Sequence, residues 1–307
     1  MHEDSGRRFV SGFVSILGRP NAGKSTLLNA LAGMKLAIVS TRPQTTRTAI
    51  QGVLNLPHAQ VVFVDTPGIH KPDTLFNQRM LETVRAALHE RDLLLYVADA
   101  TRRFEAADRL AVELVKAAAA PATLLLNKID RLRNKSLLLP LIEQYRSLHD
   151  FAAYIPVSAL EGSGLDELKK EIVERLPPGP RYFPPDHITD QPERFLVAEL
   201  VREKVLEEVR QEVPHAVFVL VERWEDTPAL TRIYAVVYVE REGQKGIIIG
   251  AQGSMLKRIG TRARLEIEHL LGRKVFLELH VKVKPAWRES PRFLDAVDWR
   301  SMGTEVE

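Results

Sequence analysis

The sequence predicts an α/β domain, with a mostly parallel sheet and helices on both faces, followed by a smaller α+β domain. Over the first 175 residues, short apolar runs alternate with longer amphipathic stretches, which is the pattern of βα units. The stretch 176–192 then holds six prolines, more than a helix or a central strand tolerates. Beyond it, helical stripes are separated by runs of β-branched and aromatic residues, which indicates an α+β arrangement.

These changes of pattern predict the domain boundaries. We expect the α/β domain at 1–175, a proline-rich linker at 176–192, the α+β domain at 193–284 and a C-terminal tail at 285–307. The total of 307 residues agrees with two domains of roughly 150 residues each.

Apolar runs at 13–17, 61–64, 93–97 and 123–126 predict the parallel strands of the first domain, with a further strand at 154–157. Each run ends in a polar or glycine-containing loop. Parallel sheets bind ligands beyond the carboxyl ends of their strands, so these loops are the candidate binding elements.

The second domain begins with valines four residues apart, which predict a helix over 193–210. Runs at 215–223 and 231–240 predict a strand pair, and a second apolar stripe predicts a helix over 253–271. Strict alternation over 275–283 predicts a last strand with one buried face.

Composition excludes several classes of site and location. The chain has no cysteine, which excludes disulfides, thiolate metal sites and cysteine nucleophiles. No apolar run approaches the ~20 residues of a membrane-spanning helix. The charged first residues lack the apolar core of a signal peptide, so a cytoplasmic location is expected.

Charge is unevenly distributed although the net charge is only +3. Residues 241–284 hold 10 Lys/Arg and 4 Asp/Glu, whereas residues 181–240 hold 7 and 12. A basic stretch of this kind attracts phosphates, although a solvated charged face is the alternative that charge alone favours.

The segment after the first strand, Gly18-Arg19-Pro20-Asn21-Ala22-Gly23-Lys24-Ser25, matches the phosphate-binding pattern G-x-x-x-x-G-K-[ST]. Its glycines let backbone N–H groups approach a phosphate at the start of the following helix. We expect Lys24 to reach the β- and γ-phosphates and Ser25 to bind Mg²⁺. The nucleotide-contacting residues predicted here are Gly18, Asn21, Ala22, Gly23, Lys24, Ser25 and Thr26.

The identity of the base depends on Asn127-Lys128-Ile129-Asp130, which follows the strand at 123–126. The Asp130 carboxylate can accept two N–H groups of guanine, whereas adenine would leave it unpaired in the pocket. Asn127 is expected to bond the purine edge, and the Lys128 stem to cover the ring. A backbone N–H of the Ser158-Ala159 pair can point at the guanine oxygen.

Two further segments complete a site for phosphoryl transfer. Asp65-Thr66-Pro67-Gly68 follows the strand at 61–64, where Asp65 can hold the Mg²⁺ shell and the Gly68 N–H can meet the γ-phosphate. The loop 43–47 must supply a hydroxyl to the metal, and we choose Thr46 over Thr45.

The order of these motifs resembles translation-factor-related small GTPases. The sequences P-Q-T-T-R at 43–47 and D-T-P-G-I-H-K-P at 65–72 are similar to those of the Era family of bacterial ribosome-assembly GTPases. The resemblance extends over roughly residues 9–300, through E-R-E-G-Q-K at 240–245 and I-I-I-G-A-Q-G at 247–253. It implies a P-loop GTPase domain followed by a type II KH domain.

The resemblance also implies an activity and partners. GTP hydrolysis would depend on Lys24, Thr46, Asp65 and Gly68, with GTP or GDP, Mg²⁺ and a K⁺ ion near Asn21 as ligands. A loop-shaping role is the alternative for Asn21. The implied partners are the 3′ end of 16S ribosomal RNA and the 30S subunit, with peripheral contact at the inner face of the cell membrane and a monomeric chain.

The loop Gly250-Ala251-Gln252-Gly253 fits the G-x-x-G pattern, with which KH domains clamp single-stranded nucleic acid through the backbone. We expect RNA contacts from Gly250, Ala251, Gln252, Gly253, Lys257, Arg258 and Arg262. Gln252 stands where many relatives have lysine. The alternatives are a GTPase whose second domain docks a protein or membrane surface, and a translation or RNA-modification enzyme with further chemistry.

Overall fold

The computed structural model describes residues 8–40, 42, 44–69, 73–89, 91–118, 120–209, 213–296 and 298. Contacts divide the chain into two compact units. The described part of the first comprises 8–37, 46–69 and 79–190, and that of the second comprises 38–45, 73–78 and the chain from 191 onward, apart from the gaps just given.

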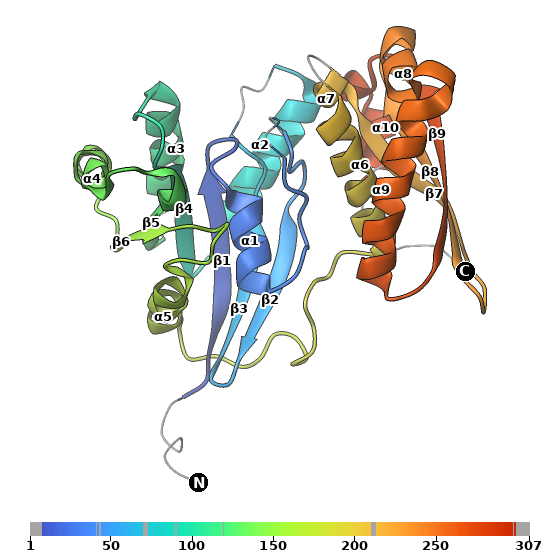
Figure 1. The fold of residues 1–307 in the computed structure, drawn as a ribbon. Helices are drawn as coiled ribbons and strands as arrows, with labels where there is room; N and C mark the ends of the chain where they lie inside the picture. Colours follow the sequence, from blue (N-terminus) through green and yellow to red (C-terminus); the bar gives the residue numbers. More distant parts are fainter. Residues whose placement is uncertain are drawn as a thin grey trace. The chain divides into compact units, whose positions relative to one another are not determined.

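The first unit is built on a six-stranded sheet with the order β2-β3-β1-β4-β5-β6 (Figure 1). The strands are β1 (Val10–Gly18), β2 (Ile50–Leu56), β3 (Ala59–Asp65), β4 (Leu93–Asp99), β5 (Ala122–Asn127) and β6 (Ala153–Val157). All neighbours are parallel except β2 and β3, which pair antiparallel. The predicted parallel strands are therefore confirmed.

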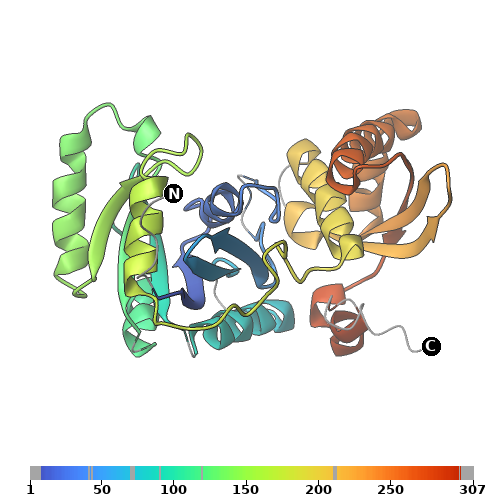
Figure 2. The ribbon, with the colours of Figure 1, turned by 90° about the horizontal axis from the view of Figure 1, so that it is seen from below.

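Helices cover both faces of this sheet, as predicted. Helices α1 (Lys24–Ala32) and α5 (Leu165–Arg175) pack on one face, through a core that includes Leu28 and Leu168. Helices α3 (Ala106–Ala117) and α4 (Leu138–Arg146), with the later turns of α2 (Leu75–Leu88), pack on the other. Figure 2 shows α1 and α2 on opposite sides of the strands.

Strand β2 was not predicted, because Gly52 and Asn55, residue types that strands disfavour, interrupt its apolar pattern. It lies at the edge of the sheet, where it pairs with β3. The proline-rich stretch lies along this edge without helix or strand. Its Phe183 carbonyl accepts a hydrogen bond from Gln60, and the Ile188 carbonyl accepts one from the Val53 N–H.

The second unit holds a three-stranded sheet with the order β7-β8-β9. The strands are β7 (Phe218–Asp226), β8 (Thr231–Val239) and β9 (Val275–Val283), with β7 antiparallel and β9 parallel to β8. The helices are α6 (Glu193–Glu208), α7 (Val213–Ala216), α8 (Glu242–Ile249), α9 (Ser254–Leu271) and α10 (Pro291–Ala296). The first predicted strand begins at Phe218 rather than 215, because α7 occupies the preceding residues.

Helices α6 and α9 lie side by side on one face of this sheet (Figure 2). Val201, Ile259 and Ile267 of the predicted stripes are fully buried in their shared core. The Trp287 ring is also buried, and its Nε1 donates to the Ala216 carbonyl at 2.8 Å. No helix of the described chain has the length and apolar character that a membrane span needs.

Short 3₁₀ turns complete the fold at η1 (Ile129–Arg131), η2 (Lys135–Leu137), η3 (Ala251–Gly253) and η4 (Trp287–Glu289). Val39, Gln44 and Thr45 of the preceding segment contact α6, where the Glu203 carboxylate accepts from the Val39 N–H at 2.8 Å. The buried Arg202 guanidinium, paired with Glu199, donates to the carbonyl oxygens of Gln44 and Thr45. Thr46, the next residue, belongs to the first unit.

Candidate functional site

The phosphate loop joins β1 to α1 and requires glycine at two positions. A Cβ on Gly18 would lie 2.3 Å from the Val97 carbonyl oxygen, and one on Gly23 would lie 2.2 Å from Asn127 Nδ2. Both residues have positive φ, at 151° and 98°. The backbone can therefore approach its neighbours, and a phosphate, as closely as the motif implies.

Lys24 begins α1 and is buried beneath this loop. Its Nζ donates to the carbonyl oxygens of Gly18 and Arg19, each at 3.2 Å. Burial lowers the pKa of the Lys24 ammonium, against the opposing effect of Asp65. An ammonium in so dry a position interacts strongly with an added anion, because little water competes for it.

Three predicted metal-binding residues come together. Ser25 Oγ lies 2.7 Å from both Thr46 Oγ1 and Asp65 Oδ2, and Thr46 Oγ1 lies 3.3 Å from the same carboxylate oxygen. Asp65 Oδ1 is buried and meets no hydrogen-bond partner among the residues that the structure describes. Burial raises the pKa of Asp65 to about 6, although Lys24 opposes it.

These oxygens fit Mg²⁺, which prefers hard oxygen ligands and is bound through few protein groups when phosphates supply others. Among the described residues there is no group of three or more His, Cys, Asp or Glu side chains that could hold a metal. One carboxylate and two hydroxyls are the donor set of a site that also needs a bound phosphate.

The segment after β3 is held close to the phosphate loop. Thr66 donates through its Oγ1 to the Ile16 carbonyl at 2.9 Å. A Cβ on Gly68 would lie 3.0–3.3 Å from Pro20, so glycine fits this approach and a larger residue would crowd it. Pro67, which lies between Thr66 and Gly68 in the chain, is buried. The motif residues Pro43, His70, Lys71 and Pro72 lie outside the described residues.

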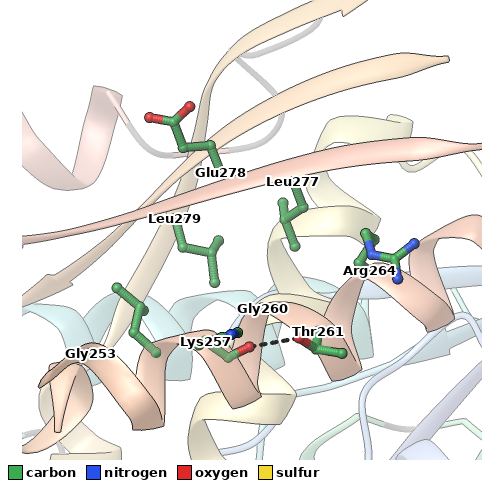
Figure 3. Close-up of a pocket in the computed structure, with 9 residues that line it drawn as sticks. Gly253, Lys257, Gly260, Thr261, Arg264, Leu277, Glu278 and Leu279 are labelled. Atoms are coloured by element: carbon green, nitrogen blue, oxygen red, sulfur yellow. Dashed lines mark hydrogen bonds between the residues drawn. The ribbon is translucent and has the colours of Figure 1, made fainter. Parts of the chain in front are cut away.

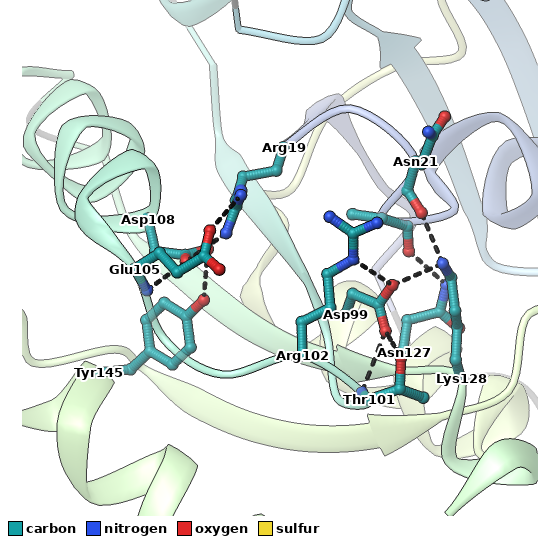
Figure 4. A network of polar contacts seen from close by, with 11 residues as sticks. Arg19, Asn21, Asp99, Thr101, Arg102, Glu105, Asp108, Asn127, Lys128 and Tyr145 are labelled. Carbon is teal, nitrogen blue, oxygen red and sulfur yellow. Dashed lines mark hydrogen bonds and ion pairs between the residues drawn. The ribbon is translucent and has the colours of Figure 1, made fainter. Parts of the chain in front are cut away.

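The base-binding segment contacts the phosphate loop directly (Figure 4). Asn127 Nδ2 donates to the Ala22 carbonyl at 2.8 Å, and Asn127 Oδ1 accepts from the Ala159 N–H at 3.0 Å. Lys128 Nζ donates to the Asn21 carbonyl at 2.6 Å. Asn127 therefore joins two parts of the site, a role that the sequence analysis did not predict.

Asp130 lies beside Ser158, whose Oγ donates to Asp130 Oδ1 at 2.7 Å. This hydrogen bond orients the carboxylate that we expect to bind guanine. Lys128 pairs with Asp99 Oδ2 at 2.6 Å. Burial works to raise the pKa of Asp99, but the hydrogen bonds from Lys128 and Thr101 hold it below its ordinary value. Asp99 was missed because a lone aspartate at a strand end resembles any capped turn.

The remaining nucleotide-site prediction, Thr26, lies in the first turn of α1. The structure thus brings the predicted residues of the first unit to one sheet edge, where the carboxyl ends of β1, β3, β4, β5 and β6 meet. Their roles toward a nucleotide stay predictions.

The second unit presents a groove beside the G-x-x-G loop (Figure 3). It is lined by Gly253, Leu256, Lys257, Gly260, Thr261, Arg264, Leu277, Glu278 and Leu279. Helix α9 supplies one wall and the edge strand β9 the other. Gly250 has φ 71°, and a Cβ there would lie 2.6 Å from Met255 Cβ, so the turn requires glycine. Ala251 and Gln252 are both exposed at the tip of the loop.

Not all predicted RNA contacts line this groove. Lys257 does, whereas Arg258 pairs with Glu208 at 2.7 Å. Arg262 pairs with Glu208 at 3.0 Å and also with Glu207. These two arginines therefore face α6. Arg264 lines the groove but was not predicted, although it falls in the same basic stretch.

Each of the two units matches a known family model. Residues 13–128 match the family model described as 50S ribosome-binding GTPase, and residues 212–288 match the KH domain model. GTPase Era of Rippkaea orientalis is 48% identical over 92% of this chain and 90% of its own. GTPase Era of Syntrophus aciditrophicus is 48% identical over 93% of this chain and 94% of its own.

Two solved structures are similar over nearly the whole chain. One is a tyrosine-to-alanine variant of Aquifex aeolicus Era bound to GDP·AlF₄⁻, with a TM-score of 0.91. The other is Era in complex with MgGDPNP and nucleotides 1506–1542 of 16S ribosomal RNA, with a TM-score of 0.92. Each is 41% identical and covers 95% of this chain and 99% of the other.

Proposed function

The chain belongs to the Era family of GTPases, and from this premise we propose that it binds the 3′ end of 16S ribosomal RNA and assists assembly of the 30S subunit. The enzyme hydrolyses GTP to GDP and phosphate. Release from an assembly intermediate would follow hydrolysis. The observation that carries the RNA assignment is the glycine-turned groove of the second unit, in a chain similar to an Era bound to 16S nucleotides.

The description of the family model that matches the first unit names the large, 50S ribosomal subunit. The RNA in the similar structure is 16S RNA, which belongs to the small subunit. We favour the small subunit, because the relatives named Era match more than nine-tenths of the chain and the family model matches only 13–128.

In the proposed mechanism, Lys24 binds the β- and γ-phosphates, and the Gly68 N–H donates to the γ-phosphate as negative charge develops there. Ser25, Thr46 and Asp65 would hold Mg²⁺, which when bound offsets the phosphate charge. Asp130 selects guanine, with Asn127, Lys128, Ser158 and Ala159 around the base.

Intrinsic hydrolysis is expected to be slow. In several GTPases a glutamine just after D-x-x-G orients the attacking water, and here that position is Ile69, which cannot hydrogen-bond. Asn21 is proposed to hold a K⁺ ion near the phosphates. Turnover compared in KCl and NaCl at matched ionic strength tests this, and equal rates would contradict it.

The RNA assignment is tested with Ala251→Asp combined with Gln252→Asp. Two carboxylates at the loop tip should repel the phosphate backbone and abolish binding to a single-stranded 16S 3′-end fragment. GTP hydrolysis without RNA should persist, since the substitutions lie far from the phosphate loop in sequence. Unchanged RNA affinity in a folded variant would exclude this loop as the RNA site.

The second candidate is a GTPase whose C-terminal domain docks a protein or the inner surface of the cell membrane. The basic charge of 241–284 suits anionic lipid as well as RNA. Crosslinking in cell extract separates the two: RNA crosslinks within 241–262 support the first, and binding to anionic vesicles without RNA crosslinks supports the second.

A further inference from the structure

The second residue of the phosphate loop, Arg19, has no part in the function described above, yet its side chain is tied into the first unit (Figure 4). We propose that Arg19 is a positioning residue for Lys24: its ion pair with Asp108 fixes the phosphate loop, so that the Arg19 carbonyl holds the Lys24 ammonium where the phosphates bind.

The anchor of this arrangement is Asp108 in the first turn of α3, with only 4% of its surface exposed. Its Oδ2 accepts from Arg19 Nη1 at 2.8 Å and from the Glu105 N–H at 2.9 Å. Its Oδ1 accepts from the hydroxyls of Tyr145 at 3.0 Å and Tyr96 at 3.5 Å. A carboxylate held by four donors has little freedom, so it is a fixed point for the arginine.

Asp108 matters more than the second acidic partner. Glu105 Oε2 also lies 2.8 Å from Arg19, but the Glu105 side chain is 61% exposed and that of Asp108 only 6%. Exposed ion pairs contribute little because water screens them. The buried contact with Asp108 is therefore expected to set the position of the guanidinium.

The same residue reaches Lys24 through its main chain. The Arg19 carbonyl accepts from Lys24 Nζ at 3.2 Å and from the Ala22 N–H at 3.2 Å. Because the anchored side chain and this carbonyl share one Cα, loss of the anchor removes one restraint on the orientation of the peptide and leaves the hydrogen bond from Ala22. The carbonyl would then hold the buried ammonium less firmly where the phosphates bind.

A purely structural reading is that the network only begins α3. Asp108 and Glu105 form a reciprocal capping box, which is sufficient for that purpose without Arg19. The two readings differ in what an Arg19 variant does: the structural one predicts a change in stability, whereas ours predicts a change in nucleotide binding.

The experiment uses the full chain with Arg19→Ala, Arg19→Lys, Asp108→Asn and the double variant Arg19→Ala/Asp108→Asn. Arg103→Ala is the matched control, since it removes a positive charge from an exposed residue near the same loop. The readouts are Kd for GDP, KM and kcat for GTP, and the midpoint of thermal unfolding without nucleotide.

We expect Kd for GDP and KM for GTP to rise by about tenfold in Arg19→Ala and Asp108→Asn, the loss typical of one charge-assisted hydrogen bond. Kd for GDP and KM for GTP should rise by similar factors, because Lys24 contacts a phosphate that both nucleotides carry. The value of kcat should stay within about twofold of that of the unmodified protein. Arg19→Lys should recover part of the loss, and the double variant should be no worse than either single variant.

Three results would overturn the proposal. They are unchanged Kd and KM in a folded Arg19→Ala variant, an equal loss in Arg103→Ala, or additive losses in the double variant. A lower unfolding midpoint with normal nucleotide binding would favour the structural reading instead.

Discussion

Lys257 and Arg258 are adjacent cations on α9, and the structure predicts different consequences for RNA binding when each is removed. Lys257 lines the groove beside the G-x-x-G loop, whereas the Arg258 guanidinium lies 2.7 Å from Glu208. Lys257→Ala and Arg258→Ala therefore delete the same charge one residue apart, and each serves as the control for the other.

The magnitude follows from counting phosphate contacts. One lost contact to a single strand lowers the slope of log affinity against log salt by about 0.7. Lys257→Ala should show this change and bind RNA about fivefold more weakly at moderate salt. Arg258→Ala should leave the slope within experimental error, because Glu208 already offsets the charge that it removes.

The assay is a fluorescence titration of a labelled 16S 3′-end fragment at several KCl concentrations between roughly 50 and 200 mM. Over that range, the loss of one contact changes the ratio of the unmodified protein's affinity to the variant's affinity by ~2.6-fold. If Arg258→Ala loses as much slope as Lys257→Ala, then the pair with Glu208 opens on binding and lining the groove does not decide which cation contacts RNA.

Three further predictions concern the nucleotide site. Asp130→Asn should lower GTP affinity by about 100-fold and allow XTP to bind, because the new amide faces the N–H donors of guanine; a competition assay in which GTP preference persists would refute it. Gly23→Ala should abolish nucleotide binding, because the new Cβ would lie 2.2 Å from Asn127 Nδ2. Gly33→Ala is the matched control: its Cβ would meet nothing within 4 Å, so the substitution should cost only about 1 kcal/mol of stability. Thr46→Ala should raise the Mg²⁺ concentration needed for half-maximal hydrolysis and leave GDP affinity nearly unchanged; an unaltered Mg²⁺ titration would remove Thr46 from the metal site.

The sequence was sufficient for those parts of the site that depend on short segments. Gly18, Gly23 and Lys24 are fixed by local spacing, and the strands before and after them have the apolar runs of buried parallel strands. The carboxyl ends of those strands share one edge by topology, so Asp65 and Asp130 could be assigned to the same site without coordinates.

Contacts between residues far apart in the sequence could not be predicted in this way. Arg19 and Asp108 are separated by 89 positions, and each alone resembles an ordinary surface or capping residue. The pairing of Arg258 with Glu208 was missed for the same reason: helical spacing gives the face that a residue occupies on α9 but not which helix packs beside it.

The buried charges of the first unit are better explained by ligand binding than by stability. Lys24 and Asp65 are both buried, and burial shifts their pKa values in opposite directions, toward the neutral form of each. An apolar pair of similar size would be less costly to bury. The nearby core, with Leu27 and Val14 fully buried, holds the loop without them. Because a triphosphate and a divalent cation would each add a partner of opposite charge, the unfavourable burial becomes favourable interaction on binding, and the fold is preorganised for it.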